Sequence, residues 1–77
     1  MDKNFSKLKN IILTIFNNEK NKIDHSTKLK SFKKFDSLNH LNLIFLIQKK
    51  FNIKLTLKEI ENSNTVGDLH KNITKKI

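Results

Sequence analysis

The centre of the chain, residues 35–51, reads FDSLNHLNLIFLIQKKF. Asp36 is a favourable N-cap residue, because its carboxylate can accept a hydrogen bond from a free N–H group in the first turn of a helix. The apolar residues that follow span a wide arc at helical spacing and continue to about Phe51. We therefore expect a helix over residues 37–51 to be the central and most buried element of the fold. Its apolar positions are Leu38, Leu41, Leu43, Ile44, Phe45, Leu46, Ile47 and Phe51.

A second helical pattern precedes this segment, over residues 3–16. Its apolar residues lie three and four positions apart, so they form one continuous stripe. Asn17 and Asn18 are poor helix formers in tandem, and we expect them to end this helix. Residues 17–35 show no sustained period, and their isolated apolar residues predict a long loop that is pinned across the helices. These anchors are Ile23, Leu29, Phe32 and Phe35.

Two capping signals mark the C-terminal third of the chain. Thr56 with Glu59 three residues later predicts a short helix, and Thr65 with Asp68 predicts a similar start for a last helix. The apolar face of that last helix is expected to comprise Val66, Leu69, Ile73 and Ile77. The pattern as a whole predicts an all-α fold of four helices, three longer and one short, with a long loop between the first two. With 77 residues, we expect a single domain over residues 1–77.

Composition excludes several classes of function. A chain this short buries only about 60% of the surface that its unfolded form exposes, which leaves little room for a deep catalytic cleft. It has no cysteine, so disulfides, thiolate nucleophiles and cysteine metal sites are excluded. The three histidines, His25, His40 and His70, are too scattered to predict a metal site. No set of nucleophile, base and orienting group can be assembled, so we do not expect an enzyme.

The strongest compositional feature is the charge of +9. Such a charge raises nucleic acid as a partner, but all 16 basic residues are lysine and none is the arginine that usually recognises bases and phosphates. The phenylalanines also fall at core spacing rather than among the basic residues. We interpret most of the charge as compositional bias and keep a small basic nucleic-acid-binding protein as the alternative. With no signal-peptide pattern and no apolar run of membrane-spanning length, we expect a cytoplasmic protein without membrane insertion.

The stretch around Ser37 resembles the modification site of acyl carrier proteins. Residues 51–55, FNIKL, are similar to the end of that family's second helix, and residues 65–69, TVGDL, are similar to the start of its last helix. Asp-Ser-Leu alone would be little more than a helix cap; the long loop before it and the later segments at the family's spacing carry the resemblance. Residues 3–16 match only in length and pattern. The resemblance implies a four-helix bundle of the acyl-carrier type.

The same resemblance implies that Ser37 carries a covalent 4′-phosphopantetheine, transferred from coenzyme A by a phosphopantetheinyl transferase. Asp36 would help to hold that enzyme's magnesium ion, and Leu38 would give the enzyme an apolar contact. A phosphodiester in the first turn of a helix also gains about 0.3–1 kcal/mol from the helix dipole. The thiol of the arm would hold an acyl or aminoacyl group as a thioester and present it to acyl-activating, acyl-transferring or condensing enzymes.

Further positions take on roles only through the resemblance. Some apolar residues of the family sheath the acyl chain, although their pattern by itself predicts an ordinary core. They are Leu41, Ile44, Ile47, Leu55, Ile60, Val66, Leu69 and Ile73. Partner docking falls on the second helix, at Asn39, His40 and Asn42. His40 lies one turn after Ser37, where its side chain could touch the phosphate.

The sequence also departs from the family, whose second helix typically presents acidic residues to basic partners. Residues 37–51 contain no acid and end close to Lys49 and Lys50. Partners therefore cannot dock by the usual charge match. The choice between fatty-acid synthesis and a dedicated pathway for one acyl or aminoacyl group stays open, and we expect a monomer. A third hypothesis is a regulatory module that keeps the carrier fold without modification.

Overall fold

The computed structural model describes residues 3–16 and 23–77. In this part of the chain it contains four α-helices and a short 3-10 helix at Leu29–Ser31. The α-helices are α1 (Lys3–Phe16), α2 (Ser37–Phe51), α3 (Leu57–Asn62) and α4 (Val66–Thr74). The predicted all-α architecture with one short helix and a long first connection is confirmed. The predicted helix end at Asn17 and Asn18 lies outside the described residues.

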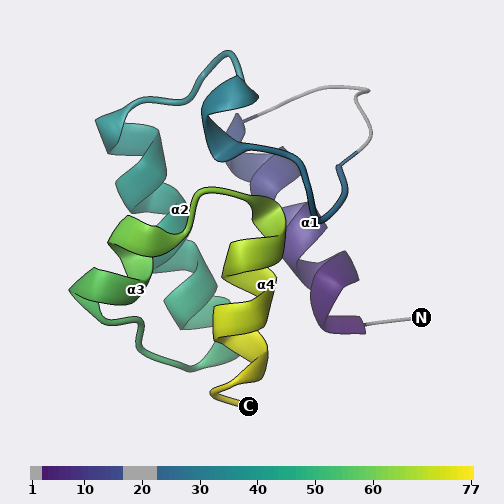
Figure 1. The fold of residues 1–77 in the computed structure, drawn as a ribbon, viewed down its shortest axis with the longest axis vertical. Helices are drawn as coiled ribbons and strands as arrows, with labels where there is room; N and C mark the ends of the chain where they lie inside the picture. The colour runs from purple at the N-terminus through teal and green to yellow at the C-terminus, as the bar shows by residue number, and fades with distance from the viewer. Residues whose placement is uncertain (1–2, 17–22) are drawn as a thin grey trace.

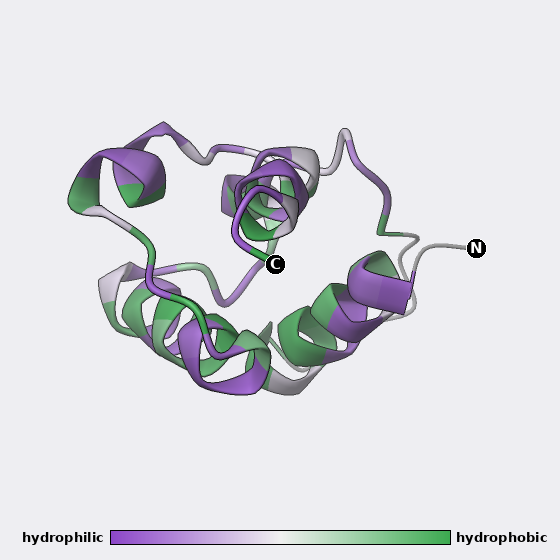
Figure 2. Cartoon of the chain, turned by 90° about the horizontal axis from the view of Figure 1, so that it is seen from below, coloured by the Kyte–Doolittle hydropathy of each residue, from purple (hydrophilic) through white to green (hydrophobic). Residues whose placement is uncertain are grey.

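The core lies among α1, α2 and α4. Helix α1 runs in the opposite direction to the other two and packs against both of them (Figure 1). Viewed along the bundle, hydrophobic residues gather on the sides of α1 and α4 that face the interior (Figure 2). Burial of each leucine or isoleucine side chain contributes about 1.5–3 kcal/mol. Completely buried positions on these helices include Leu8, Ile12, Leu43, Ile47, Leu69 and Ile73.

The expectation that α2 is the most buried helix is wrong. Only one side of α2 enters the core, through Leu43, Ile44, Ile47 and Phe51. Leu46 is partly buried against the core, whereas the remaining apolar residues of α2 point to solvent, because no other element covers that side of the helix. Leu38, Leu41 and Phe45 are 67%, 64% and 66% exposed. The wide apolar arc therefore consists of a buried face and a separate exposed face.

The connection before α2 is held across one end of the bundle, as predicted for its described part. The side chains of Ile23, Leu29 and Phe32 are buried in the common core. The backbone of this connection also supplies acceptors to the free N–H groups of α4. Val66 N–H donates to the carbonyl of Thr27 and Gly67 N–H to that of His25, each at 2.9 Å. The loop therefore caps α4 and is fixed by it.

Two side-chain caps begin α3 and α4 where the sequence predicted them. Thr56 and Glu59 form a reciprocal capping box, and Thr65 and Asp68 form another. The last helix ends at Thr74, so the prediction that Ile77 belongs to its buried face is wrong. Ile77 is 58% exposed, because no helical turn remains to direct it inward.

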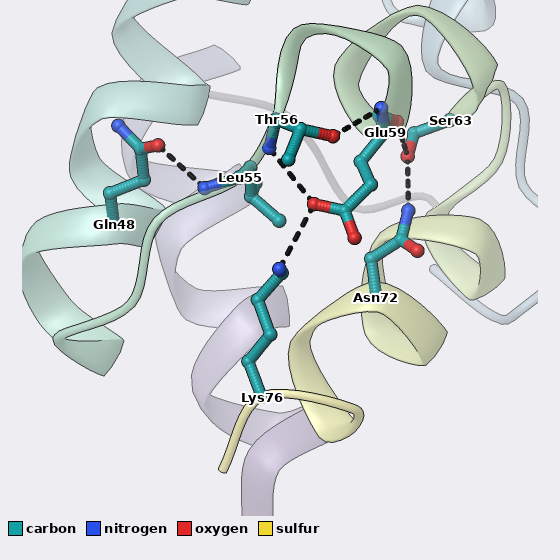
Figure 3. Close-up of polar contacts among 7 residues, drawn as sticks. All are labelled: Gln48, Leu55, Thr56, Glu59, Ser63, Asn72 and Lys76. Atoms are coloured by element: carbon teal, nitrogen blue, oxygen red, sulfur yellow. Dashed lines mark hydrogen bonds and ion pairs between the residues drawn. The ribbon is translucent and has the colours of Figure 1, made fainter.

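Helix α3 is held mainly by polar contacts, since none of its residues is fully buried. The Glu59 carboxylate lies 3.1 Å from the Lys76 ammonium, and the Asn72 amide donates to the Ser63 hydroxyl at 2.9 Å (Figure 3). The connection before α3 is fixed to α2, because Leu55 N–H donates to Oε1 of Gln48 at 2.8 Å (Figure 3). Few apolar contacts and several exposed hydrogen bonds are typical of a region that opens more readily than the core.

Candidate functional site at the start of helix α2

The start of α2 is defined by Asp36, whose backbone is extended at φ −153° and ψ 178°. Its Oδ1 accepts from the N–H of Asn39 at 2.8 Å, and its carbonyl accepts from the N–H of His40 at 2.8 Å. The side-chain amide of Asn39 donates to the carbonyl of Lys34 at 2.7 Å. These bonds fix both the first turn and the chain that leads into it.

Ser37 is the first residue of α2 and is exposed. No residue in the described ranges makes a hydrogen bond to its hydroxyl, and none accepts from the N–H groups of Ser37 or Leu38. Unpaired N–H groups at a helix start favour an anion, because they carry the positive end of the helix dipole. The residues here therefore fit a phosphate ester on the Ser37 oxygen: the hydroxyl is accessible, and donors lie beside it.

The other described serines are in different settings. The hydroxyl of Ser26 donates to Asp24 at 2.8 Å, and that of Ser31 donates to the carbonyl of Lys28 at 2.6 Å. Ser63 is buried and takes part in the contacts around α3. Ser6 is exposed but lies within α1 rather than at its start. Only Ser37 combines exposure with a helix start in the described part of the chain.

Aromatic packing holds the approach to Ser37 in place. The ring of Phe35 lies 6.2 Å from that of Phe16, which stacks on Phe32 at 4.9 Å. The imidazole of His40 lies 5.3 Å from the Phe35 ring, and its Nε2 is buried. His40 therefore supports the anchoring of Phe35, and its buried Nε2 is not exposed toward the solvent in which a phosphate on Ser37 would lie. Sequence spacing alone did not indicate this contact.

The residues expected to form the docking face differ in accessibility. Asn42 is exposed, whereas Asn39 and His40 are half-buried in the contacts described above. Leu38 is exposed beside Ser37.

Among the apolar residues predicted to line the core or sheath the acyl chain, the prediction for Leu41 is wrong. It is 64% exposed on the outer side of α2 and belongs to neither the core nor an interior cavity. Ile60 is partly buried, and the others lie in the core. Those others are Ile44, Ile47, Leu55, Val66, Leu69 and Ile73.

A surface hollow of about 380 Å³ lies between the long loop and the connection from α3 to α4. Leu29 and Phe35 contribute apolar surface to it, and Lys28, Asn64 and Thr65 contribute polar surface. It adjoins the approach to Ser37, since Phe35 precedes the Asp36 cap by one residue.

Carboxylates with a shifted pKa have structural causes away from Ser37. The backbone N–H of Asn64 lowers the pKa of Asp68, and that of Thr56 lowers the pKa of Glu59. The Ser26 hydroxyl and backbone lower the pKa of Asp24. Each shift comes from hydrogen bonds that a turn or helix start makes to the charged form, so none marks a catalytic acid or base.

Two of the histidines that look scattered in the sequence are neighbours in the structure. The rings of His25 and His70 lie 5.1 Å apart, and Phe5 stacks on His25 at 4.2 Å. The fold brings α1, the long loop and α4 together here, which the spacing along the chain could not indicate. Across residues 3–16 and 23–77, no group of three or more potential ligand residues could hold a metal ion.

The chain is similar to known carrier proteins in sequence and in fold. The family model for the phosphopantetheine attachment site matches residues 6–73. The fold is similar to that of the holo acyl carrier protein from Geobacter metallireducens, with a TM-score of 0.85 and 29% identity over 95% of this chain and 84% of that one. It is also similar to a structure described as an acyl carrier protein from Mycobacterium tuberculosis, with a TM-score of 0.85 and 24% identity over 94% and 96% of the two chains. No curated protein sequence matches the chain.

The fold, with an accessible serine at the start of a helix, defines a small helical carrier domain rather than an enzyme. The chain belongs to the phosphopantetheine-binding family of acyl carrier proteins. Members carry a covalently attached 4′-phosphopantetheine, and they are carriers rather than catalysts. The nucleic-acid-binding alternative is not favoured. Among the described residues, no helix has both the length and the apolar character needed to cross a membrane.

Proposed function

We propose that Ser37 is the attachment point of the 4′-phosphopantetheine and that the loaded arm carries an acyl or aminoacyl group as a thioester. The observation that carries this proposal is the exposed Ser37 hydroxyl at the start of α2, next to N–H groups that no described residue occupies. The N-cap contact from Asp36 to Asn39 supports it, because the contact holds the helix start in one geometry during docking.

The chain contributes position rather than catalysis to the modification. Ser37 lies within residues 6–73, which match the family model, and Asp36 and Leu38 flank it. The phosphate ester would lie on the positive end of α2, and bound phosphopantetheine supplies the terminal thiol. A tethered cargo reaches each docked enzyme at a high effective concentration, which is the advantage of a carrier over free diffusion.

We further propose that the partners are a phosphopantetheinyl transferase and enzymes that activate, transfer or condense acyl groups. The absence of acidic residues from residues 37–51 favours a dedicated pathway over general fatty-acid synthesis, because the usual charge match is missing.

The test is the intact mass of the full chain after incubation with coenzyme A, magnesium and a broad-specificity transferase. We expect one added phosphopantetheine on the natural chain and none on Ser37→Ala. Ser6→Ala is the matched control, since Ser6 is an exposed serine on α1, and it should be modified like the natural chain. Modification of Ser37→Ala, or none of the natural chain with several transferases, would contradict the assignment. Release of a loaded acyl group by neutral hydroxylamine tests the thioester.

A further inference from the structure

The exposed side of α2 carries a continuous apolar stripe that starts beside Ser37. Leu38, Leu41 and Phe45 lie three and four residues apart, so they share one face of the helix, and each is about two-thirds exposed. Single exposed leucines are common on protein surfaces, but a contiguous row of large apolar side chains marks an interaction site. The opposite face of α2 supplies the core contacts, so the fold does not require this stripe.

The stripe continues into a hollow at the far end of α2. The hollow measures about 450 Å³ and is bordered by Phe45, Lys49, Ile53 and Lys54, among others. At a rise of about 1.5 Å per residue, the face from Leu38 to Asn52 extends for roughly 20 Å. It is therefore long enough to contact a partner along a whole helix.

Between residues 33 and 54, every charged side chain is a lysine except Asp36. Residues 37–51 contain no acid, Lys49 and Lys54 lie at the hollow, and Lys33 and Lys34 precede the helix. Asp36 is the nearest carboxylate in the sequence, and its Oδ1 is engaged by the N–H of Asn39. A basic surface is complementary to an acidic one, and like charges across an interface oppose association.

We propose that this surface, consisting of Leu38, Leu41, Phe45, Lys49 and Lys54, binds partner enzymes through an apolar groove bordered by carboxylates. The proposal rests on the function proposed above, because it names the kind of enzyme surface that receives the modified serine. It reverses the charge pattern implied by the resemblance to the family. The apolar contacts supply most of the affinity, and the lysines steer the encounter and select the partner.

The charge arm of the test uses a transferase whose carrier-facing surface is basic and a form in which those residues are glutamates. Each is titrated with the full natural chain and with Lys49→Glu/Lys54→Glu, without coenzyme A, so that binding is measured without reaction. At low salt, we expect each oppositely charged pair to bind at least tenfold tighter than each like-charged pair. The difference should shrink strongly at high salt. Equal affinities in all four combinations at low salt would overturn the proposal.

The apolar arm compares Leu41→Ser and Phe45→Ser with Leu57→Ser. Leu57 is 71% exposed on α3, a different helix from that of the stripe, and is the matched control. Relative to the natural chain, we expect the two α2 variants to bind the transferase at least tenfold more weakly and Leu57→Ser to bind it with less than a twofold change. Thermal unfolding should be unchanged for all three variants. An equal loss for Leu57→Ser would refute the proposed surface.

Amide shift mapping of the natural chain on titration with the transferase separates this proposal from the carrier assignment. Shifts along the exposed face of α2 without modification of Ser37 would support the proposed surface and contradict the proposed carrier function. Modification of Ser37 with shifts confined to other elements would support the proposed carrier function and contradict the proposed surface.

Discussion

Replacement of Gly67 by alanine tests how the long loop and α4 hold each other. A Cβ at this position would lie 2.7 Å from the carbonyl oxygen of His25 and 3.0 Å from its Cβ. The first neighbour is a backbone atom, so it cannot move away as a flexible side chain would. The same carbonyl accepts from the Gly67 N–H at 2.9 Å, so relief of the clash weakens that hydrogen bond.

The expected effect is the balance of three contributions. Alanine gains about 0.5–1 kcal/mol over glycine in a helix. Overpacking costs about 1–3 kcal/mol, and a lost hydrogen bond costs about 0.5–1.5 kcal/mol. We expect Gly67→Ala to lower the free energy of unfolding by about 2 kcal/mol, because the two costs exceed the gain. For a domain of this size, that corresponds to a Tm lower by about 8–16 °C.

Thermal and urea unfolding followed by circular dichroism measure this effect. Lys71→Ala, at an exposed position of α4, is the control and should change stability by less than about 0.5 kcal/mol. Amide hydrogen exchange should also become faster at Val66, whose N–H donates to the neighbouring Thr27 carbonyl at 2.9 Å. A Tm equal to or above that of the natural chain would refute the reasoning, since helix propensity would then outweigh the contact.

Three further predictions concern stability. Ile47→Ala removes a fully buried side chain and should cost about 2–5 kcal/mol in urea unfolding, whereas Leu41→Ala should stay within about 0.5 kcal/mol; equal losses would place Leu41 in the core after all. Hydrogen bonds lower the pKa of Glu59 and Asp68 from ordinary values of 4.5 and 3.8, so their contribution is present above those values and is lost as pH falls through the lowered ones. The Tm should therefore fall in acid below about pH 5, and less steeply for Glu59→Gln/Asp68→Asn. Parallel profiles of Tm against pH for the natural chain and the variant would contradict a contribution of these carboxylates to acid sensitivity. With a net charge of +9, self-repulsion should be screened by salt, so the Tm should rise on addition of sodium chloride, and a flat or falling response would mean that the lysines already lie far enough apart or are paired.

Local signals were sufficient to predict most of the helices. The caps at Asp36, Thr56 and Thr65 were predicted because each depends on side chains within three residues of the helix start. The end of α2 near Phe51 followed from the periodicity of its apolar residues in the same way.

The candidate site was predictable in its chemistry and less so in its surroundings. The position of Ser37 after an N-cap follows directly from residues 36–39. The packing of His40 on Phe35 does not, because Phe35 itself packs on Phe16 of α1, which is distant in the sequence.

The sequence by itself determined the helices, their caps and the serine at the start of α2, since these depend on propensity and short-range hydrogen bonds. Only the tertiary structure decided which apolar residues of α2 are buried. Periodicity shows that side chains share a face but not whether another element covers that face. Leu43 and Ile47 meet the other helices, whereas Leu41 and Phe45 meet solvent. The packing of the bundle therefore determines that the apolar stripe beside Ser37 is exposed.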